Sequence, residues 1–135
     1  MMDILLVQQH SVSQIQNLLS AIFECPVERV KIFDADAFNA LNEELDELLF
    51  DCICVIFPVR GDAAQLLQLY RYKLDESDVL RKSIEIALRD KIHCYIPNES
   101  MDGWIYVRDG ETPKHVQSIE SDEQDYFSFK KFNNK

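Results

Sequence analysis

Hydrophobic residues along this chain alternate between the spacing of a strand and the spacing of a helix. Residues 4–7 form a short apolar run, which is typical of a buried strand. The next apolar residues recur as one helix face, and this pattern stops before Pro26. Ser11 or Ser13 can cap the start of this predicted helix. The helix face consists of Val12, Ile15, Leu18, Leu19, Ile22 and Phe23.

The rest of the first half repeats the same alternation. Residues 27–33 predict a second strand, because Val30 and Ile32 alternate with polar neighbours. Asp34 and Asp36 supply an N-cap for a second helix, whose apolar residues extend to Leu49. Residues 52–57 are apolar on both faces, which indicates a strand inside a sheet. The predicted order is therefore β-α-β-α-β.

The segment 65–74 fits two structures. One helix face would contain Leu66, Leu67, Tyr70 and Leu74. One strand face would contain Leu66, Tyr70, Tyr72 and Leu74. Residues 60–62 predict a turn just before it. The short turn and the aromatic content favour a strand that forms a hairpin with residues 50–58.

The second half predicts one helix and several strands. The helix covers about residues 77–91, with Asp75 or Ser77 as its cap. Strands are expected near 92–97, 103–108, 115–120 and 126–132, and the last directs Phe127 and Phe129 inward. The helix presents a central stripe of Leu80, Ile84, Ala87, Leu88 and Lys91, flanked by Val79, Ser83 and Ile86.

These patterns predict an α/β fold of the α+β type in one domain, residues 1–135. A mixed sheet is expected to combine the N-terminal run with a C-terminal antiparallel meander. The helices are expected to pack on that sheet.

Charge separates this chain from many small domains. It carries 24 acidic and 14 basic residues, for a net charge of −10. Such a field repels nucleic acids and anionic membranes and attracts basic partners, although it also keeps a small protein in solution. The acids concentrate in two runs, 34–51 and 109–125. We expect a cytoplasmic protein, because neither a signal peptide nor a membrane-length apolar run is evident.

Residues with catalytic chemistry are scattered. The 3 glycines cannot build a phosphate-binding loop, and the 3 histidines have no metal-ligand spacing. Cys52 and Cys54 share one strand face, where small core residues are more common than a metal or redox pair. Glu43 and Glu47 suit a solvated helix face better than an acid–base pair. We therefore expect a protein that is not an enzyme, with no catalytic residue, metal or cofactor.

One strand combines residues that are common at interfaces. Trp104, Tyr106 and Arg108 share one face of the strand predicted at 103–108. Either this face binds a partner, or another element covers it and makes the aromatic residues part of the core. The second possibility is slightly favoured.

From residue 74 onward the chain resembles the small immunity proteins of bacterial polymorphic-toxin and contact-dependent growth inhibition systems. The resemblance lies in a helix at 83–88, an extended segment at 92–96, and a tryptophan strand that ends in Asp109-Gly110. An acidic meander at 116–129 completes it. It implies a cytosolic protein that binds and neutralises a cognate toxin domain, commonly a basic nuclease.

A partner-binding surface is therefore expected on the acidic runs and the aromatic strand. The alternative is a small acidic protein of the secretion-chaperone type, which would be a dimer, whereas an immunity protein is expected to be a monomer when free. The residues expected to bind the partner are Asp34, Asp36, Glu43, Glu44, Glu47, Trp104, Tyr106, Glu120, Asp122, Glu123 and Asp125.

Overall fold

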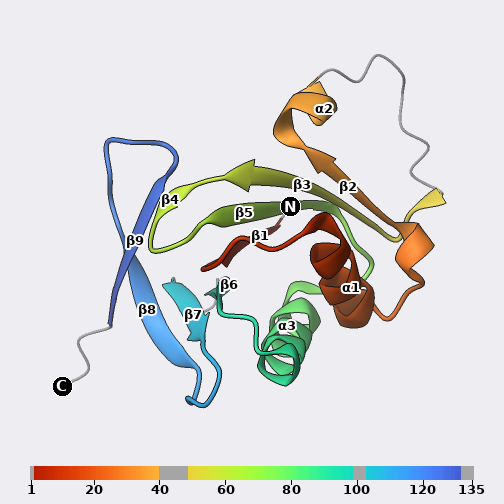
Figure 1. The fold of residues 1–135 in the computed structure, drawn as a ribbon. Coiled ribbons are helices and arrows are strands. Elements are labelled where there is room, and N and C mark those ends of the chain that lie inside the picture. Colours follow the sequence, from red (N-terminus) through yellow and green to blue (C-terminus); the bar gives the residue numbers. More distant parts are fainter. Residues whose placement is uncertain (1, 40–48, 99–102, 132–135) are drawn as a thin grey trace.

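The computed structural model describes residues 2–39, 49–98 and 103–131 and contains three α-helices, one 3-10 helix and nine strands in that part of the chain (Figure 1). The helices are α1 (Val12–Phe23), the 3-10 helix η1 (Val27–Arg29), α2 (Ala35–Asn39) and α3 (Glu76–Asp90). The strands are β1 (Met2–Leu6), β2 (Val30–Asp34), β3 (Cys52–Pro58), β4 (Arg60–Gly61), β5 (Gln65–Arg71), β6 (Cys94–Asn98), β7 (Gly103–Val107), β8 (Lys114–Ile119) and β9 (Tyr126–Lys131).

The strands form one mixed sheet in the order β2-β3-β5-β1-β6-β7-β8-β9-β4. β2 pairs with β3 in parallel and β4 pairs with β9 in parallel, while the other neighbours are antiparallel. The predicted α+β class with a mixed sheet is confirmed. None of the described helices is long and apolar enough to span a membrane.

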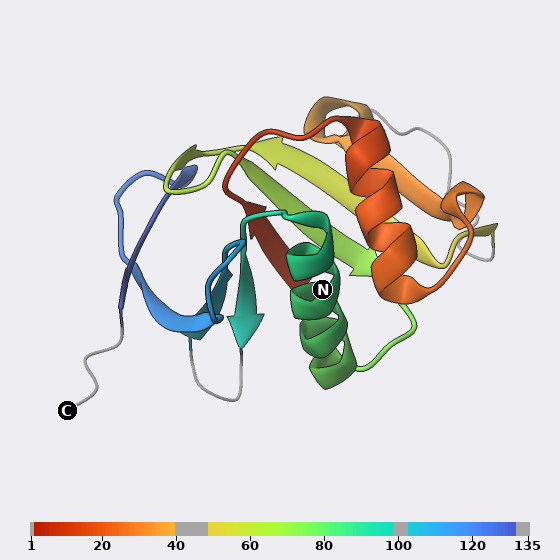
Figure 2. The ribbon, with the colours of Figure 1, turned by 60° about the horizontal axis from the view of Figure 1, so that its bottom comes forward.

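One face of the sheet is covered by α1 and α3, which lie side by side (Figure 2). In β1, Ile4 and Leu6 point to these helices, and Leu5 belongs to a separate cluster on the opposite face. β1 lies between β5 and β6, so its alternating side chains are buried on both faces. The sequence indicated a buried first strand but not its place at the centre of the sheet.

α1 begins after a serine whose side chain can accept a hydrogen bond from a backbone N–H group of the first helical turn. Ser11 is the cap: its hydroxyl accepts the Gln14 N–H, and the Gln14 side chain accepts the Ser11 N–H. Ile15 and Leu19 are buried as predicted. Val12 is 54% exposed, because it lies in the first turn, outside the face that meets the sheet.

α3 is rotated from its predicted orientation. The Asp75 carboxylate accepts the Asp78 N–H, so Asp75 is the cap. The fully buried residues are Val79, Ser83, Ile86 and Ala87, whereas the predicted central residues Leu80, Ile84 and Leu88 are only partly buried. The helix packs against both α1 and β6, and its most buried line therefore faces the corner between them.

The segment 65–74 contains a strand, as favoured by the sequence. β5 pairs antiparallel with β3, from Pro58 opposite Gln65 to Ile53 opposite Arg71. Residues 27–29, predicted as the start of a strand, form η1 instead, because Arg29 N–H donates to the Pro26 carbonyl. Most of the second predicted helix, residues 40–48, lies outside the described residues.

The predicted turn at residues 60–62 lies in the connection where the chain reverses between the antiparallel strands β3 and β5. The sequence did not show that Arg60 and Gly61 also form β4, which pairs with β9. β4 continues the path of β3 after one residue, Val59. Hydrogen bonds connect β3 through β5, β1, β6, β7, β8 and β9 to β4. The chain itself joins β4 back to β3, so these strands form a closed ring, which we call the strand ring. Figure 1 shows β8 and β9 bending away from the helices and returning to β4.

The inside of the strand ring is an aromatic cluster. Tyr95 stacks on Phe129 with ring centroids 3.9 Å apart and on Tyr106 at 4.7 Å. Trp104 meets Phe129 edge to face at 5.5 Å. The side chains come from β6, β7 and β9, so ring closure buries aromatic surface that a flat sheet would leave open.

Gly61 makes the closure possible. Its φ is +95°, and a Cβ atom there would lie 2.1 Å from the Phe127 carbonyl oxygen. We predict that Gly61→Ala lowers the free energy of unfolding by about 2 kcal/mol or more, because β4 must separate from β9. Urea denaturation measures the loss.

Gly110→Ala is the matched control for Gly61→Ala. Gly110 also has a positive φ, +79°, but nothing lies within 4 Å of its Cβ position. It should cost only about 1 kcal/mol, the backbone contribution. Equal losses in the two variants would mean that contact with β9 does not restrict residue 61.

Ser83 provides a second test of the core. Ser83 is 2% exposed, and its hydroxyl has no hydrogen-bond partner among the described residues. We predict that Ser83→Ala raises the unfolding free energy by about 1 kcal/mol, because an unsatisfied buried hydroxyl is removed. Ser20→Ala should instead lower the unfolding free energy, because the Ser20 hydroxyl donates to the Cys25 carbonyl at 2.5 Å. Thermal and urea unfolding measure the stability of both variants. A loss of stability in Ser83→Ala, or a gain in Ser20→Ala, would contradict the prediction.

Candidate binding surface

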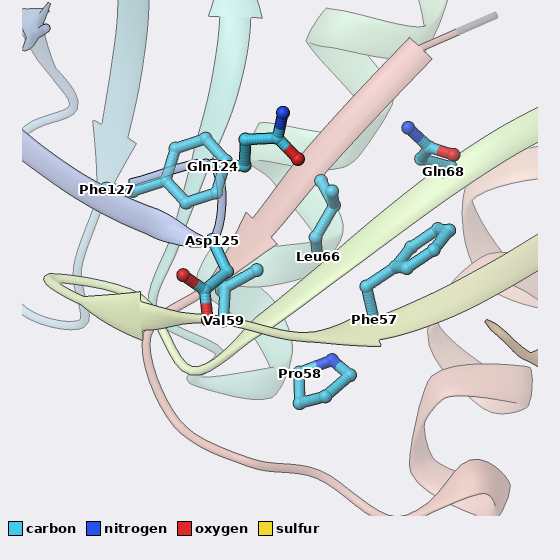
Figure 3. A pocket seen from close by; sticks show the side chains of 8 residues that line it. All are labelled: Phe57, Pro58, Val59, Leu66, Gln68, Gln124, Asp125 and Phe127. Carbon is cyan, nitrogen blue, oxygen red and sulfur yellow. The ribbon is translucent and has the colours of Figure 1, made fainter. Parts of the chain in front are cut away.

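A cleft of about 360 Å³ opens where β3 and β4 meet the start of β9 (Figure 3). We call this cleft the barrel mouth, because it lies at one end of the strand ring. Openings of small barrels are frequent ligand sites. The lining residues are Phe57, Pro58, Val59, Leu66, Gln68, Gln124, Asp125 and Phe127.

Strand alternation explains the lining of the barrel mouth. On β5, Leu67 and Leu69 point toward the helices, and Leu66 and Gln68 point the other way, into the cleft. Phe57 and Phe127 approach from β3 and β9. These apolar cleft side chains are only partly buried in the free chain, so a ligand could cover them further.

The polar groups of the barrel mouth come from different elements. The Tyr70 hydroxyl donates to Gln68 Oε1 at 2.8 Å, which fixes one amide. Gln124 lies in the exposed turn before β9, and Figure 3 shows it on the opposite side of Leu66 from Gln68. Asp125 is held by Arg60, whose Nη2 donates to Asp125 Oδ1 at 3.0 Å. The same guanidinium lowers the pKa of Asp125.

Asp3 extends this surface along the sheet. It is paired with Gln68 across β1 and β5, on the face opposite Ile4 and the helices. Asp3 as a whole is partly exposed, but its Oδ1 atom is buried and has no hydrogen-bond partner in the described part of the chain. Burial raises the pKa of this carboxyl group. Sequence reasoning did not select Asp3, although an acid within an otherwise apolar strand was a visible signal.

A second cavity, about 650 Å³, lies beyond the carboxyl ends of β1, β2 and β3. The loop after β1 forms one wall, and Gln65 anchors it: His10 N–H donates to Gln65 Oε1 at 2.8 Å, and Gln65 Nε2 donates to the His10 carbonyl at 3.1 Å. Lys31 and Asp34 line the opposite wall. Because Ser11 is engaged as the cap of α1, this wall offers no activated nucleophile.

The N-terminal acidic residues have two different roles. Asp34 Oδ1 accepts the Ala37 N–H at 2.6 Å, so it holds the start of α2. Asp36 is exposed in the first turn of that helix. Glu43, Glu44 and Glu47 lie outside the described residues.

The C-terminal acidic residues are also divided. Glu120 and Asp122 are exposed in the turn between β8 and β9. Glu123 and Asp125 form ion pairs with Arg60, and they therefore help to hold β9 on β4. In Figure 1 this turn and α2 lie on the same side of the β3–β4 path, α2 over β3 and the turn beside β4.

Trp104 and Tyr106 are mainly core residues. Both belong to the aromatic cluster inside the strand ring, and both are partly buried. The interpretation that another element covers this face is correct, and the covering strand is β9. Arg108 lies beyond the end of β7 and is exposed.

Three of the four thiols lie in the core. Cys52, Cys54 and Cys94 are buried and free, and burial raises the pKa of each thiol, to about 12 for Cys54 and Cys94. Within residues 2–39, 49–98 and 103–131, no group of three His, Cys, Asp or Glu side chains is placed to hold a metal ion.

Comparison with known proteins identifies no relative. No family model, no curated protein and no solved structure matches the chain.

Asp51 shows that part of the acidic run stabilises the fold. Its side chain is only 16% exposed and pairs with Arg29 Nε at 2.7 Å and Lys73 Nζ at 2.6 Å. Hydrogen bonds to Arg29 and Lys73 lower its pKa from 3.8 to about 2. The stabilisation by ionised Asp51 is therefore complete above the unfolded pKa and is lost as the pH falls through the folded one.

We predict that Asp51→Asn is less stable than the parent chain near neutral pH, and that this difference shrinks as the pH falls below about 4. Urea midpoints measured across that range test it. Asp109→Asn is the control, because Asp109 is exposed in the β7–β8 turn. A difference for Asp51→Asn that is independent of pH would contradict the ion-pair explanation.

Proposed function

We propose that this chain is an immunity protein that binds a basic toxin domain and thereby blocks its active surface. The observation that carries the proposal is the position of the exposed acids. Asp36 belongs to α2, and Glu120 and Asp122 belong to the β8–β9 turn. Figure 1 shows both elements on the same side of the β3–β4 path, α2 over β3 and the turn beside β4. A positively charged partner that lies along this path would meet carboxylates at both places.

Physical reasons favour this arrangement for inhibition. The net charge of −10 speeds encounter with a basic protein, and local carboxylates determine which orientation is retained. Apolar side chains in the cleft then slow dissociation, because their contact excludes water. Trp104 and Tyr106 would support this surface from inside the strand ring rather than contact the partner directly.

The test measures binding to the products of the neighbouring genes, among which we expect to find the toxin domain. We expect nanomolar affinity that weakens as salt concentration rises, together with protection of cells that express the toxin domain. Micromolar or weaker binding that is insensitive to salt would contradict the proposal. An obligate dimer of the free chain would instead favour the secretion-chaperone alternative.

Charge reversal locates the surface. We predict that Asp36→Lys combined with Asp122→Lys slows association roughly tenfold or more, because attraction to the basic partner is lost. Asp109→Lys combined with Glu28→Lys is the matched control, with the same change of net charge at exposed positions of the β7–β8 turn and η1. Equal slowing in both pairs would mean that only net charge matters and that the acids beside the mouth have no special role.

A further inference from the structure

The barrel mouth has the features of a groove for an extended chain. Its floor is apolar, with Leu66 and Phe127 partly buried, and it opens to solvent along β5. An amide side chain stands on either side of Leu66: Gln68 on β5 and Gln124 in the turn before β9 (Figure 3). The Gln124 amide offers both a donor and an acceptor, and Gln68, whose Oε1 already accepts from Tyr70, still offers its N–H donors. These groups match the N–H and C=O groups of a peptide backbone.

Charge in this groove favours a basic ligand. Asp3 lies beside Gln68 on the same sheet face, in the next strand. Among the residues that the structure describes, no group donates a hydrogen bond to its buried Oδ1, while Asp3 as a whole remains partly exposed. A carboxylate in such a site is incompletely solvated, so a cation that reaches its exposed side is bound more strongly than at a surface carboxylate. Asp125, at the other end of the mouth, adds a negative charge that Arg60 only partly offsets.

We propose that the barrel mouth binds an extended peptide segment of the partner and that an arginine or lysine of this segment pairs with Asp3. The Gln68 and Gln124 amides hold the peptide backbone, and Leu66 and Phe127 contact its apolar side chains. This inference rests on the proposed function for the identity of the partner, but the chemistry of the groove can be tested without that partner.

The probe is a short capped peptide of alternating valine and threonine with arginine at its centre. The control peptide has citrulline at that position, which keeps the shape of arginine but carries no charge. Titration is followed by the backbone amide signals of the protein in NMR spectra. We expect the arginine peptide to bind about tenfold more tightly than the citrulline peptide, with the largest signal changes on β1, β5 and the turn before β9.

Variants separate the two kinds of contact. Asp3→Asn should remove the preference for arginine while binding of the citrulline peptide persists. Gln68→Ala should weaken both peptides by a similar factor, because it removes a backbone contact. Asp109→Asn, in the distant β7–β8 turn, should change neither affinity.

Several results would overturn this inference. They are equal affinity of the two peptides for the parent chain, absence of binding, or signal changes confined to the cavity beside His10 and Lys31. The peptide comparison needs no variant, so a folding defect in Asp3→Asn does not obscure it. If the peptides bind as expected but the toxin domain does not, only the proposed function fails. If the toxin domain binds and Asp3→Asn leaves its affinity unchanged, only the peptide groove fails.

Discussion

The pairing of β4 with β9 is the contact on which the rest of the structure depends. It joins residues that are far apart in the chain, and it converts a curved sheet into the closed strand ring. Closure protects the edge of β9 and buries the aromatic cluster around Tyr95. Asp62 strengthens it, because its N–H donates to the Phe127 carbonyl and its carboxylate accepts the Phe129 N–H. The barrel mouth exists because this closure brings the start of β9 against β3 and β5.

Local periodicity carried enough information for much of the secondary structure. The alternation of β5 and the cap and stripe of α1 follow from neighbouring residues, and the structure agrees with both. The central place of β1 and the pairing of β4 could not be predicted, because strand partners are chosen by long-range packing. The sequence marks Gly61 as a turn residue. Its positive φ also allows β4 to approach β9 closely, and this long-range contact cannot be predicted from neighbouring residues.

The candidate site was predictable only in part. Acidic runs are visible in a sequence, but the partners of each carboxylate are not. Asp51 and Asp125 form ion pairs with arginine side chains of distant elements. Glu120 and Asp122 are exposed to solvent. Asp3 and Gln68 become neighbours only because β1 inserts beside β5. A net charge therefore includes residues that hold the fold and residues that are open to a partner, and only the structure separates them.

The position of β9 in the chain also determines the order in which the molecule can be completed. During synthesis, β3, β4, β5 and β1 are available well before β9 has been made. Until then the aromatic side chains of β6 and β7 face water, and the edge of β8 has no partner. Before β9 is made, the nascent chain therefore exposes apolar surface that can associate with other chains. Pairing of β9 with β8 and β4 then covers this surface and completes the core.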